Sequence, residues 1–298
     1  MRRWITASTI RSAISTSVMT LALGVILYVG IAFADGRRQG RQGGQAPERA
    51  RYASPDQAPY LRFTPVDLAN GSKLTLISPS QWSDLADQLV QALNKTHAEY
   101  TDLFSTIPAF SSSIRLMDET AFYELTGAPG WTNAMFFRGQ IIIPLSNTKP
   151  VDVENLHRSV KHEFTHAVLS ALSEGQIPGW IDEGIAQWSE GYENPALREA
   201  LRTWLNSNEP VALSLLQGGF TKLNSDMVPA AYAQSLLATK ALIHAFGFSK
   251  IGAYLTLLRT GTERSTAFRE AFGLTLEQFE EKLGESLKTW AALPEPAV

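Results

Sequence analysis

The sequence predicts an α+β fold in which a mixed sheet with helices is followed by an all-helical C-terminal half, with a cleft between them. Strand patterns occur only before Pro150, and helical periodicity alone follows it. The motif His162-Glu163-Phe164-Thr165-His166 falls on the first long helix of the second half. Because binding sites favour crevices between such halves, we expect the motif to face the cleft.

The first half alternates strand and helix patterns. The segment KLTLIS alternates apolar and polar residues as a half-buried strand does, and the next segment carries Leu85, Leu89 and Leu93 at helical spacing. Two short apolar runs around Arg138-Gly139 read as a hairpin. The expected elements are strands at 73–78 and 112–117, helices at 81–104 and 119–126, and hairpin strands at 134–137 and 140–145.

The second half shows apolar residues at spacings of three and four, with glycine and polar breaks between the runs. The expected helices span 153–174, 182–191, 195–206, 229–247, 249–260 and 275–290.

Composition excludes several classes of function. The chain has 298 residues, of which 44% are hydrophobic, so it can bury a sizeable core. Its net charge of −3 leaves no positive excess for a phosphate backbone, so we expect no nucleic-acid partner. It has no cysteine, which excludes thiolate metal sites and disulfides, so a metal would need histidine and carboxylate ligands.

The N-terminus has the layout of an export signal. Three basic residues, Arg2, Arg3 and Arg11, precede an apolar run at 18–34. This run has no charged residue and ends in Ala-Phe-Ala. The run is long for a signal core and short for a membrane span, so residues 1–34 are expected to be either a cleaved signal peptide or a retained anchor.

We expect an extracytoplasmic location, either secreted or periplasmic, with membrane association through residues 10–34 if the segment is retained. Arg37, Arg38 and Arg41 follow the run and offset the basic residues before it, so orientation in the membrane stays open. Large domains translocate largely regardless of such flanking charge, and this favours export.

The segment 35–60 is rich in Gly, Gln, Arg, Pro and Ala and is expected to be a disordered linker. The remainder, 61–298, is expected to form one domain with an α/β part at 61–150 and a helical part at 151–298.

The motif itself is suited to metal chemistry. On a helix, His162 and His166 project from one face a single turn apart, so both imidazoles can reach one ion. Glu163 lies beside them and can accept a proton from a metal-bound water. The alternative is accidental spacing on an ordinary helix.

A further carboxylate strengthens the metal interpretation. The segment Pro178 to Gly184 places Asp182 and Glu183 at the start of the next helix. A catalytic zinc takes three protein ligands and leaves one position open. Asp182 competes with Glu183 for the third position, and its other expected role is to cap the helix.

The pattern resembles the gluzincin metallopeptidases, in particular the small membrane-associated or secreted members of the peptidase MA-like group. Those enzymes carry HExxH and then W-x-x-E-G-x-A, which is matched here by Trp180, Glu183, Gly184 and Ala186. The resemblance covers about 73–290 and implies a zincin-like fold with an active-site cleft. It also implies one zinc ion held by His162, His166 and Glu183, with Glu163 as general base.

Two more features follow from the resemblance. Asn133 to Phe137 looks like the edge strand beside which a peptide substrate lies, although Phe136 reads equally well as sheet core. Tyr232, in Ala-Tyr-Ala-Gln-Ser, resembles the tyrosine that stabilises the oxyanion, whereas its ordinary role would be helix packing.

The sequence also departs from the family pattern. Gln187 stands where thermolysin-like enzymes carry an aspartate behind a ligand histidine, and Glu190 is a second candidate for that role. His157 is turned off the ligand face and is expected at the surface, as are His97 and His244.

The predicted function is zinc-dependent hydrolysis of peptide bonds in a peptide or protein substrate. No acidic pair is placed to bind an α-amine, which favours an endopeptidase, although the resemblance covers both types. Two alternatives stay open: a catalytically inactive zincin-fold binding or assembly protein of the cell envelope, and a module with a structural metal. Intact Glu163 speaks against the first, and only three good ligands speak against the second.

Overall fold

The computed structural model describes residues 60–128, 132–137, 139–220 and 223–293. The expected signal or anchor and almost all of the expected linker lie outside these residues.

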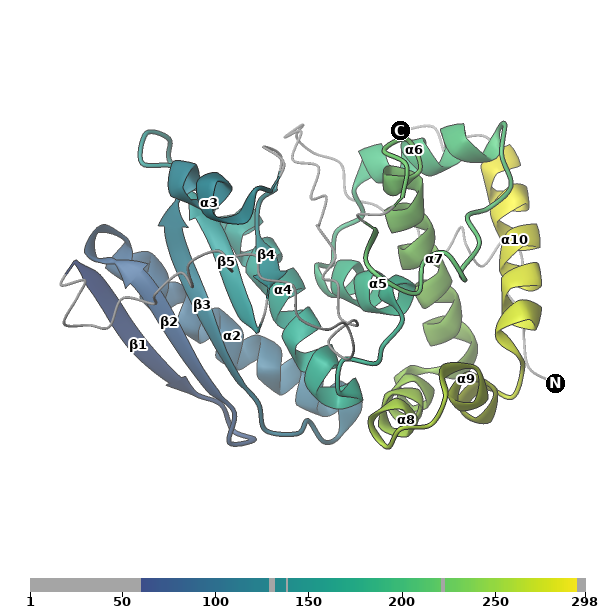
Figure 1. The fold of residues 1–298 in the computed structure, drawn as a ribbon, viewed down its shortest axis with the longest axis horizontal. Coiled ribbons are helices and arrows are strands. Elements are labelled where there is room, and N and C mark those ends of the chain that lie inside the picture. The colour runs from purple at the N-terminus through teal and green to yellow at the C-terminus, as the bar shows by residue number, and fades with distance from the viewer. Residues whose placement is uncertain (1–59, 129–131, 138, 221–222, 294–298) are drawn as a thin grey trace, which may run out of the picture.

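A five-stranded mixed sheet forms the N-terminal side of the domain (Figure 1). Its strand order is β1-β2-β3-β5-β4, in which β2, β3 and β5 are parallel, and β1 and β4 pair antiparallel at the two edges. The strands are β1 (Leu61–Asp67), β2 (Lys73–Pro79), β3 (Ser111–Asp118), β4 (Met135–Phe137) and β5 (Gln140–Leu145).

Helices make up the rest of the described chain. Those of the first half are the short 3-10 helix η2 (Ser80–Trp82), α2 (Ser83–Phe104) and α3 (Glu119–Thr126). Those of the second half are α4 (Val153–Ser173), α5 (Gly179–Ser189), α6 (Pro195–Leu205), α7 (Val228–Phe246), α8 (Phe248–Arg259), α9 (Arg264–Phe272) and α10 (Leu276–Ala292).

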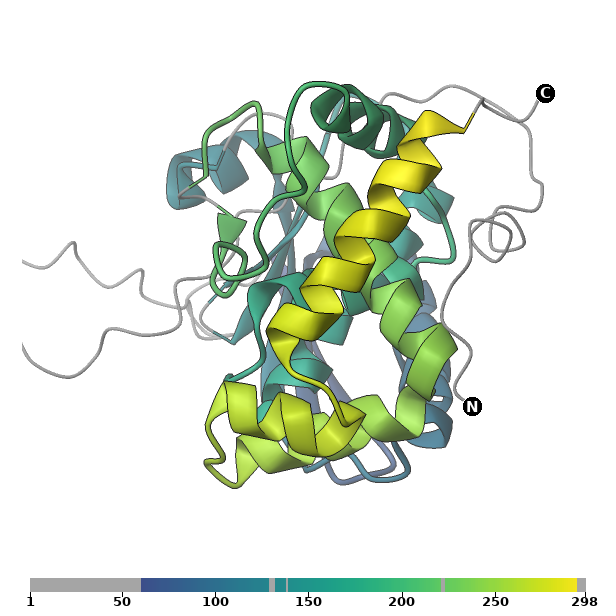
Figure 2. The same ribbon diagram turned by 90° about the vertical axis from the view of Figure 1, so that its right-hand side faces the viewer.

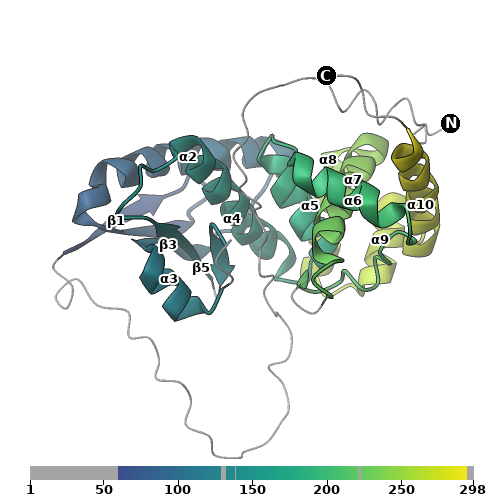
Figure 3. The ribbon, with the colours of Figure 1, turned by 90° about the horizontal axis from the view of Figure 1, so that it is seen from above.

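Both faces of the central strands are covered, as the view from above shows (Figure 3). Successive side chains of a strand point to opposite faces. Accordingly Ile141 and Ile143 join the large core shared with α2 and α4, whereas Ile142 joins a small cluster with Phe122 of α3. This arrangement holds α4 against the sheet at the side of β4 and β5.

The helical half is built around the close packing of α5 on α7, and α10 runs across its outer side (Figure 2). Gly184 permits the close approach, because a Cβ there would lie 2.0 Å from Thr239 Oγ1 and 2.4 Å from the Ser235 carbonyl oxygen. Among the described residues, no single helix is long and apolar enough to cross a membrane; α7 and α8 meet that measure only as a pair bent by 109°.

The predicted fold class is confirmed, with three differences in the elements. Strand β1 and helix α9 were not predicted, and α5 begins at Gly179 rather than at 182. The early start of α5 follows from its neighbour: the N–H groups of Gly179 and Trp180 donate to the carbonyls of Gln217 and Leu216.

Candidate metal centre

The histidine pair lies in the middle of α4. Asp152 caps this helix by accepting a hydrogen bond from the Asn155 N–H. His162 and His166 are 1% and 2% exposed, and their ring centroids lie 4.9 Å apart. The helical spacing thus brings both imidazoles to one buried place, as the sequence predicts.

Helix α5 supplies a carboxylate to the same place. Glu183 is 3% exposed, and its Oε2 lies 3.6 Å from His162 Nε2 and 3.9 Å from His166 Nε2. One ligand atom from each residue falls within 4.8 Å of the other two. These separations exceed a hydrogen bond but suit three donors that surround one ion at about 2.0–2.2 Å.

Each histidine also meets a second carboxylate through its other ring nitrogen. Glu190 Oε1 lies 2.7 Å from His162 Nδ1, and Asp182 Oδ1 lies 2.9 Å from His166 Nδ1. These contacts direct both Nε2 atoms toward Glu183, and outer carboxylates of this kind fix the ring orientation of metal-binding histidines.

The predictions for these carboxylates have mixed outcomes. Glu190 contacts His162, as predicted for one of the two candidate partners. The other candidate, Gln187, donates its amide to the carbonyls of Glu183 and Tyr232 instead. The expected capping role of Asp182 is wrong, because α5 starts earlier and Asp182 faces His166.

Opposing effects set the protonation of the two histidines. Burial lowers the pKa of His162, but Glu183 and Glu190 more than offset this and raise it well above its usual value. Burial likewise lowers the pKa of His166, and Asp182 and Glu183 reverse the shift. The site therefore concentrates negative charge around two imidazoles, which favours a bound cation.

The donor set fits a zinc ion. Two imidazole nitrogens and one carboxylate oxygen are among the ligands that zinc prefers. Glu183 Oε2 is buried and has no hydrogen-bond partner among the described residues. A buried carboxylate oxygen is costly without compensation, and a cation between the three side chains would provide it.

Glu163 lies beside this group and connects it to the sheet. It is 1% exposed, and burial raises its pKa. The backbone N–H of Phe136 in β4 donates a hydrogen bond to its carboxylate, while Oε2 has no partner among the described residues. A carboxylate with a raised pKa is better suited to receive and return a proton near neutral pH.

Strand β4 occupies the position expected of an edge strand. It is the last strand of the sheet beyond β5 and packs against α4. The Phe136 side chain is 5% exposed and belongs to the large core, so the alternative interpretation also holds for that side chain. The binding of a peptide along β4 stays a prediction.

Tyr232 is buried between helices. It is 1% exposed on α7, its ring lies 4.9 Å from that of Phe220, and its carbonyl accepts from Gln187 of α5. These contacts place Tyr232 beside the helix that carries Glu183. Its role as an oxyanion donor stays a prediction.

A chain of buried hydroxyls joins the helices behind the metal centre. Tyr100 of α2 is hydrogen-bonded to Thr165 of α4, which lies 2.9 Å from the hydroxyl of Ser189 in α5. Burial raises the pKa of Tyr100 to about 12, so the phenol stays neutral. Sequence reasoning missed this chain, because its members come from three separate helices.

The other histidines do not join the group. His244 is exposed, as expected. His97 is 2% exposed, so its expected surface position is wrong: it lies on the buried face of α2 with Leu93 and Tyr100. His157 is half-buried and likewise differs from the surface position expected.

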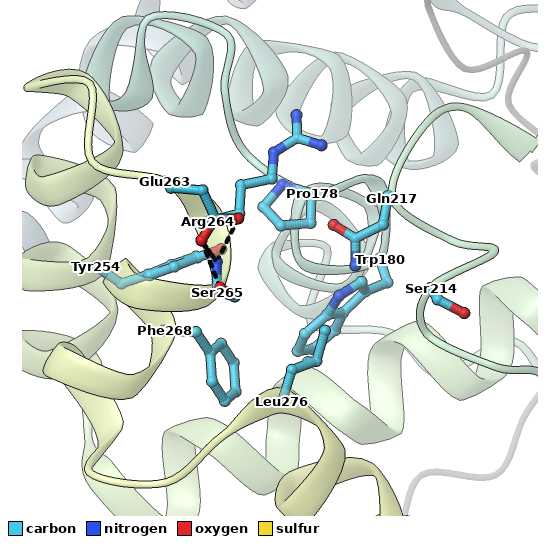
Figure 4. Close-up of a pocket in the computed structure, with 10 residues that line it drawn as sticks. All are labelled: Pro178, Trp180, Ser214, Gln217, Tyr254, Glu263, Arg264, Ser265, Phe268 and Leu276. Atoms are coloured by element: carbon cyan, nitrogen blue, oxygen red, sulfur yellow. Dashed lines mark hydrogen bonds between the residues drawn. The ribbon is translucent and has the colours of Figure 1, made fainter.

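Two pockets lie near the ends of the helices that carry the site. One, of about 200 Å³, lies where α3, the end of β5 and the first turns of α4 meet. The other, of about 230 Å³, lies on the far side of the α5 N-terminus, beside Trp180 and Tyr254 (Figure 4). Its lining includes none of His162, His166 and Glu183, and its aromatic residues are almost fully buried.

Comparison with known proteins gives one family match. The family described as "Peptidase MA superfamily" matches residues 89–289, more than half of the chain. That span includes all the residues of the metal centre. A search of curated proteins finds no significant match.

Several solved structures are similar. One is a two-domain M1 zinc metallopeptidase mutant bound to L-tryptophan, with 16% identity, a TM-score of 0.45, and coverage of 80% of this chain and 54% of that chain. Another is an M1 zinc metallopeptidase mutant from Deinococcus radiodurans bound to a Tyr-Ser-Ala substrate, with 14% identity, a TM-score of 0.43, and coverage of 78% and 52%. The present chain thus spans about half the length of these structures.

Proposed function

Because the chain belongs to the Peptidase MA superfamily, we propose that it is a zinc-dependent peptidase of the gluzincin type. In this proposal His162, His166 and Glu183 hold one zinc ion, and Glu163 is the general base. The observation that carries the proposal is that these three side chains converge in a buried place, beside the buried carboxylate of Glu163. The group counts three residues among those described, which fits a catalytic site with one open position.

The chemistry follows from the side chains. A zinc ion in this site would act as a Lewis acid and lower the pKa of a bound water to about 7. Glu163 takes the proton of the attacking water and passes it to the leaving amine, and burial helps by raising the pKa of its carboxylate. Tyr232 is proposed to stabilise the oxyanion.

The proposed substrate is a peptide or protein rather than a nucleic acid. The position of β4 at the edge of the sheet, next to Glu163, supports the idea that an extended peptide pairs with its backbone. We further propose that the enzyme acts outside the cytoplasm, on the basis of the apolar run at 18–34 that follows basic residues.

A catalytically inactive binding protein of the cell envelope is the competing function. The burial of Glu163 speaks against it. Burial of this carboxylate at 1% exposure, where its pKa is raised, costs stability, and one of its oxygens has no hydrogen-bond partner among the described residues. Such a group is explained more simply by catalysis than by binding.

The test combines zinc content with activity. Elemental analysis and cleavage of an unstructured protein would compare the parent with Glu163→Gln, Glu183→Ala and the control Glu193→Gln, whose carboxylate pairs with Lys240. We expect about one zinc per chain in the parent, in Glu163→Gln and in the control. We expect loss of zinc in Glu183→Ala and loss of cleavage in both site variants.

Other results would change the assignment. Zinc retained by Glu183→Ala would move the third ligand elsewhere, with Asp182 first in line. A parent that binds no zinc would exclude the peptidase function and favour a binding protein.

A further inference from the structure

The pocket between α3, β5 and α4 shares two chain segments with the surroundings of the proposed base. Ser159 lines the pocket and lies one turn before Glu163 on α4, so the two side chains share one face of the helix. Asn133 also lines the pocket and lies two residues before β4, the strand whose Phe136 N–H donates to Glu163. A substrate bound at Glu163 would therefore lie close to this pocket.

A buried hydroxyl of the pocket lacks a protein partner. Ser159 is 1% exposed, yet its Oγ has no hydrogen-bond partner among the described residues. Thr165 and Ser173 of the same helix instead donate to the carbonyl four residues earlier. Thr132 is fully buried in the pocket wall, and its hydroxyl also has no hydrogen-bond partner among the described residues.

The remaining lining is mixed, with apolar side chains from β5, from α4 and from the segment between them beside polar groups and charges of both signs. Asn133 and Asn155 add side-chain amides, and Glu119 and Lys149 add one charge of each sign. Asp152 also borders the pocket, but its carboxylate caps α4. The pocket thus combines apolar walls with neutral hydrogen-bonding groups, and it has no dominant charge.

We propose that this pocket receives a polar, uncharged side chain of the substrate, of the size and kind of glutamine or asparagine, from a residue next to the cleaved bond. The proposal rests on the proposed function. The volume of about 200 Å³ is sufficient, since a cavity of about 150 Å³ already holds a benzene molecule. An apolar side chain would offer no partner to the hydroxyl of Ser159 or to the amide of Asn133, which disfavours it.

The test uses matched peptides that carry Gln, Leu, Lys or Glu on one side or the other of a single cleavable bond. We expect the parent to cleave the Gln peptide with the highest kcat/KM. Ser159→Ala should lower that value by roughly three- to tenfold, as expected for one lost hydrogen bond, and should lower that of the Leu peptide less. Ser159→Thr keeps a hydroxyl and should retain the preference for Gln.

Ser173→Ala is the matched control, because it removes a buried hydroxyl from the same helix outside the pocket. Zinc content should stay at the parent value in all three variants. A parent preference for Leu, Lys or Glu would overturn the proposal, as would an equal loss on all peptides in Ser159→Ala.

Binding separates this proposal from the proposed function. If the parent holds zinc but cleaves none of the peptides, the peptidase function fails, and the pocket is judged by peptide binding alone. Fluorescence anisotropy with the Glu163→Gln variant should then still rank the Gln peptide above the Leu peptide. Equal binding of the two would contradict the pocket assignment.

Discussion

Asp182 and Glu190 hold the two histidines from outside the metal group. Glu190 is the more buried, with its side chain 6% exposed against 26% for Asp182. Helix α4 alone would not fix the orientation of either imidazole ring; the contacts with Glu190 and Asp182 do so. They explain why two imidazoles on α4 can present the same ring nitrogen to Glu183.

Removing either outer carboxylate charge should weaken metal binding. Glu190→Gln and Asp182→Asn keep the shape of the side chain but weaken the hold on the imidazole, so we expect zinc affinity to fall by about 10- to 100-fold. The loss should be larger for Glu190→Gln, because its environment excludes water more completely. Competition with a coloured chelator measures the affinity.

Glu193→Gln is the control for these variants, since it neutralises a nearby carboxylate that contacts Lys240 and no histidine. Unchanged zinc affinity in both outer-carboxylate variants would mean that these contacts have no influence on the metal.

At the residue scale, the sequence predicted the convergence of His162, His166 and Glu183 well. The motif fixes the first two through helical geometry, and the third follows in the next helix. The carboxylate partners of the two histidines were harder to predict, because they depend on where α5 begins and on how it is oriented against α4. A shift of three residues in the expected start changed Asp182 from a cap to a histidine partner.

Helices α5 and α7 approach each other unusually closely at Gly184. Any larger residue there would meet Thr239 Oγ1 and the backbone of Ser235. Backbone atoms cannot move aside as a flexible side chain can, so the glycine sets the distance between the two helices. That distance in turn positions Glu183, the next residue toward the N-terminus.

Gly184→Ala should therefore destabilise the fold. We expect a loss of about 1–3 kcal/mol in the free energy of unfolding, the usual cost of overpacking a core. Urea denaturation measures it. Gly252→Ala is the matched control on α8, where the nearest atom lies 3.8 Å from the added Cβ.

In the control, the gain in helix propensity should raise stability by up to about 1 kcal/mol. If both variants changed stability equally, the close approach of α5 and α7 would not be what requires a glycine.

The elements that escaped prediction have physical reasons. Strand β1 carries Pro65, which argues against a central strand, but β1 lies at the edge of the sheet, where a missing N–H is tolerated. Helix α9 is only nine residues long, and Glu263 caps it through hydrogen bonds to the N–H groups of Ser265 and Thr266. Short, capped elements leave little periodic signal.

At the scale of the whole molecule, the metal centre links the sheet side to the helical side. Helix α4 packs against both β5 and α8, and α5 packs against α7. An ion held between α4 and α5 would bind only the folded arrangement. Binding that is restricted to the folded state stabilises it.

Removal of zinc should accordingly lower the melting temperature. At a free-zinc concentration about 100 times the dissociation constant, the stabilisation is about 2.7 kcal/mol, or roughly 5–10 °C for a domain of this size. Scanning fluorimetry with and without a chelator measures the shift. The Glu183→Ala variant should show no response to the chelator, and a response equal to that of the parent would contradict the ligand assignment.

The proposed ligands and the outer carboxylates lie within the stretch from His162 to Glu190. This stretch contains the second half of α4, one short connection, and α5 with the residue that follows it. Closing so short a loop costs little chain entropy, so the two helices can bring these side chains together early in folding. The surroundings of Glu163, the proposed base, involve more distant parts of the chain. Its hydrogen-bond donor is in β4, and the neighbouring pocket is lined in part by α3 and β5. The protein would thus build its candidate metal site from one local stretch of chain, whereas the surroundings of the proposed base wait for contacts between distant segments.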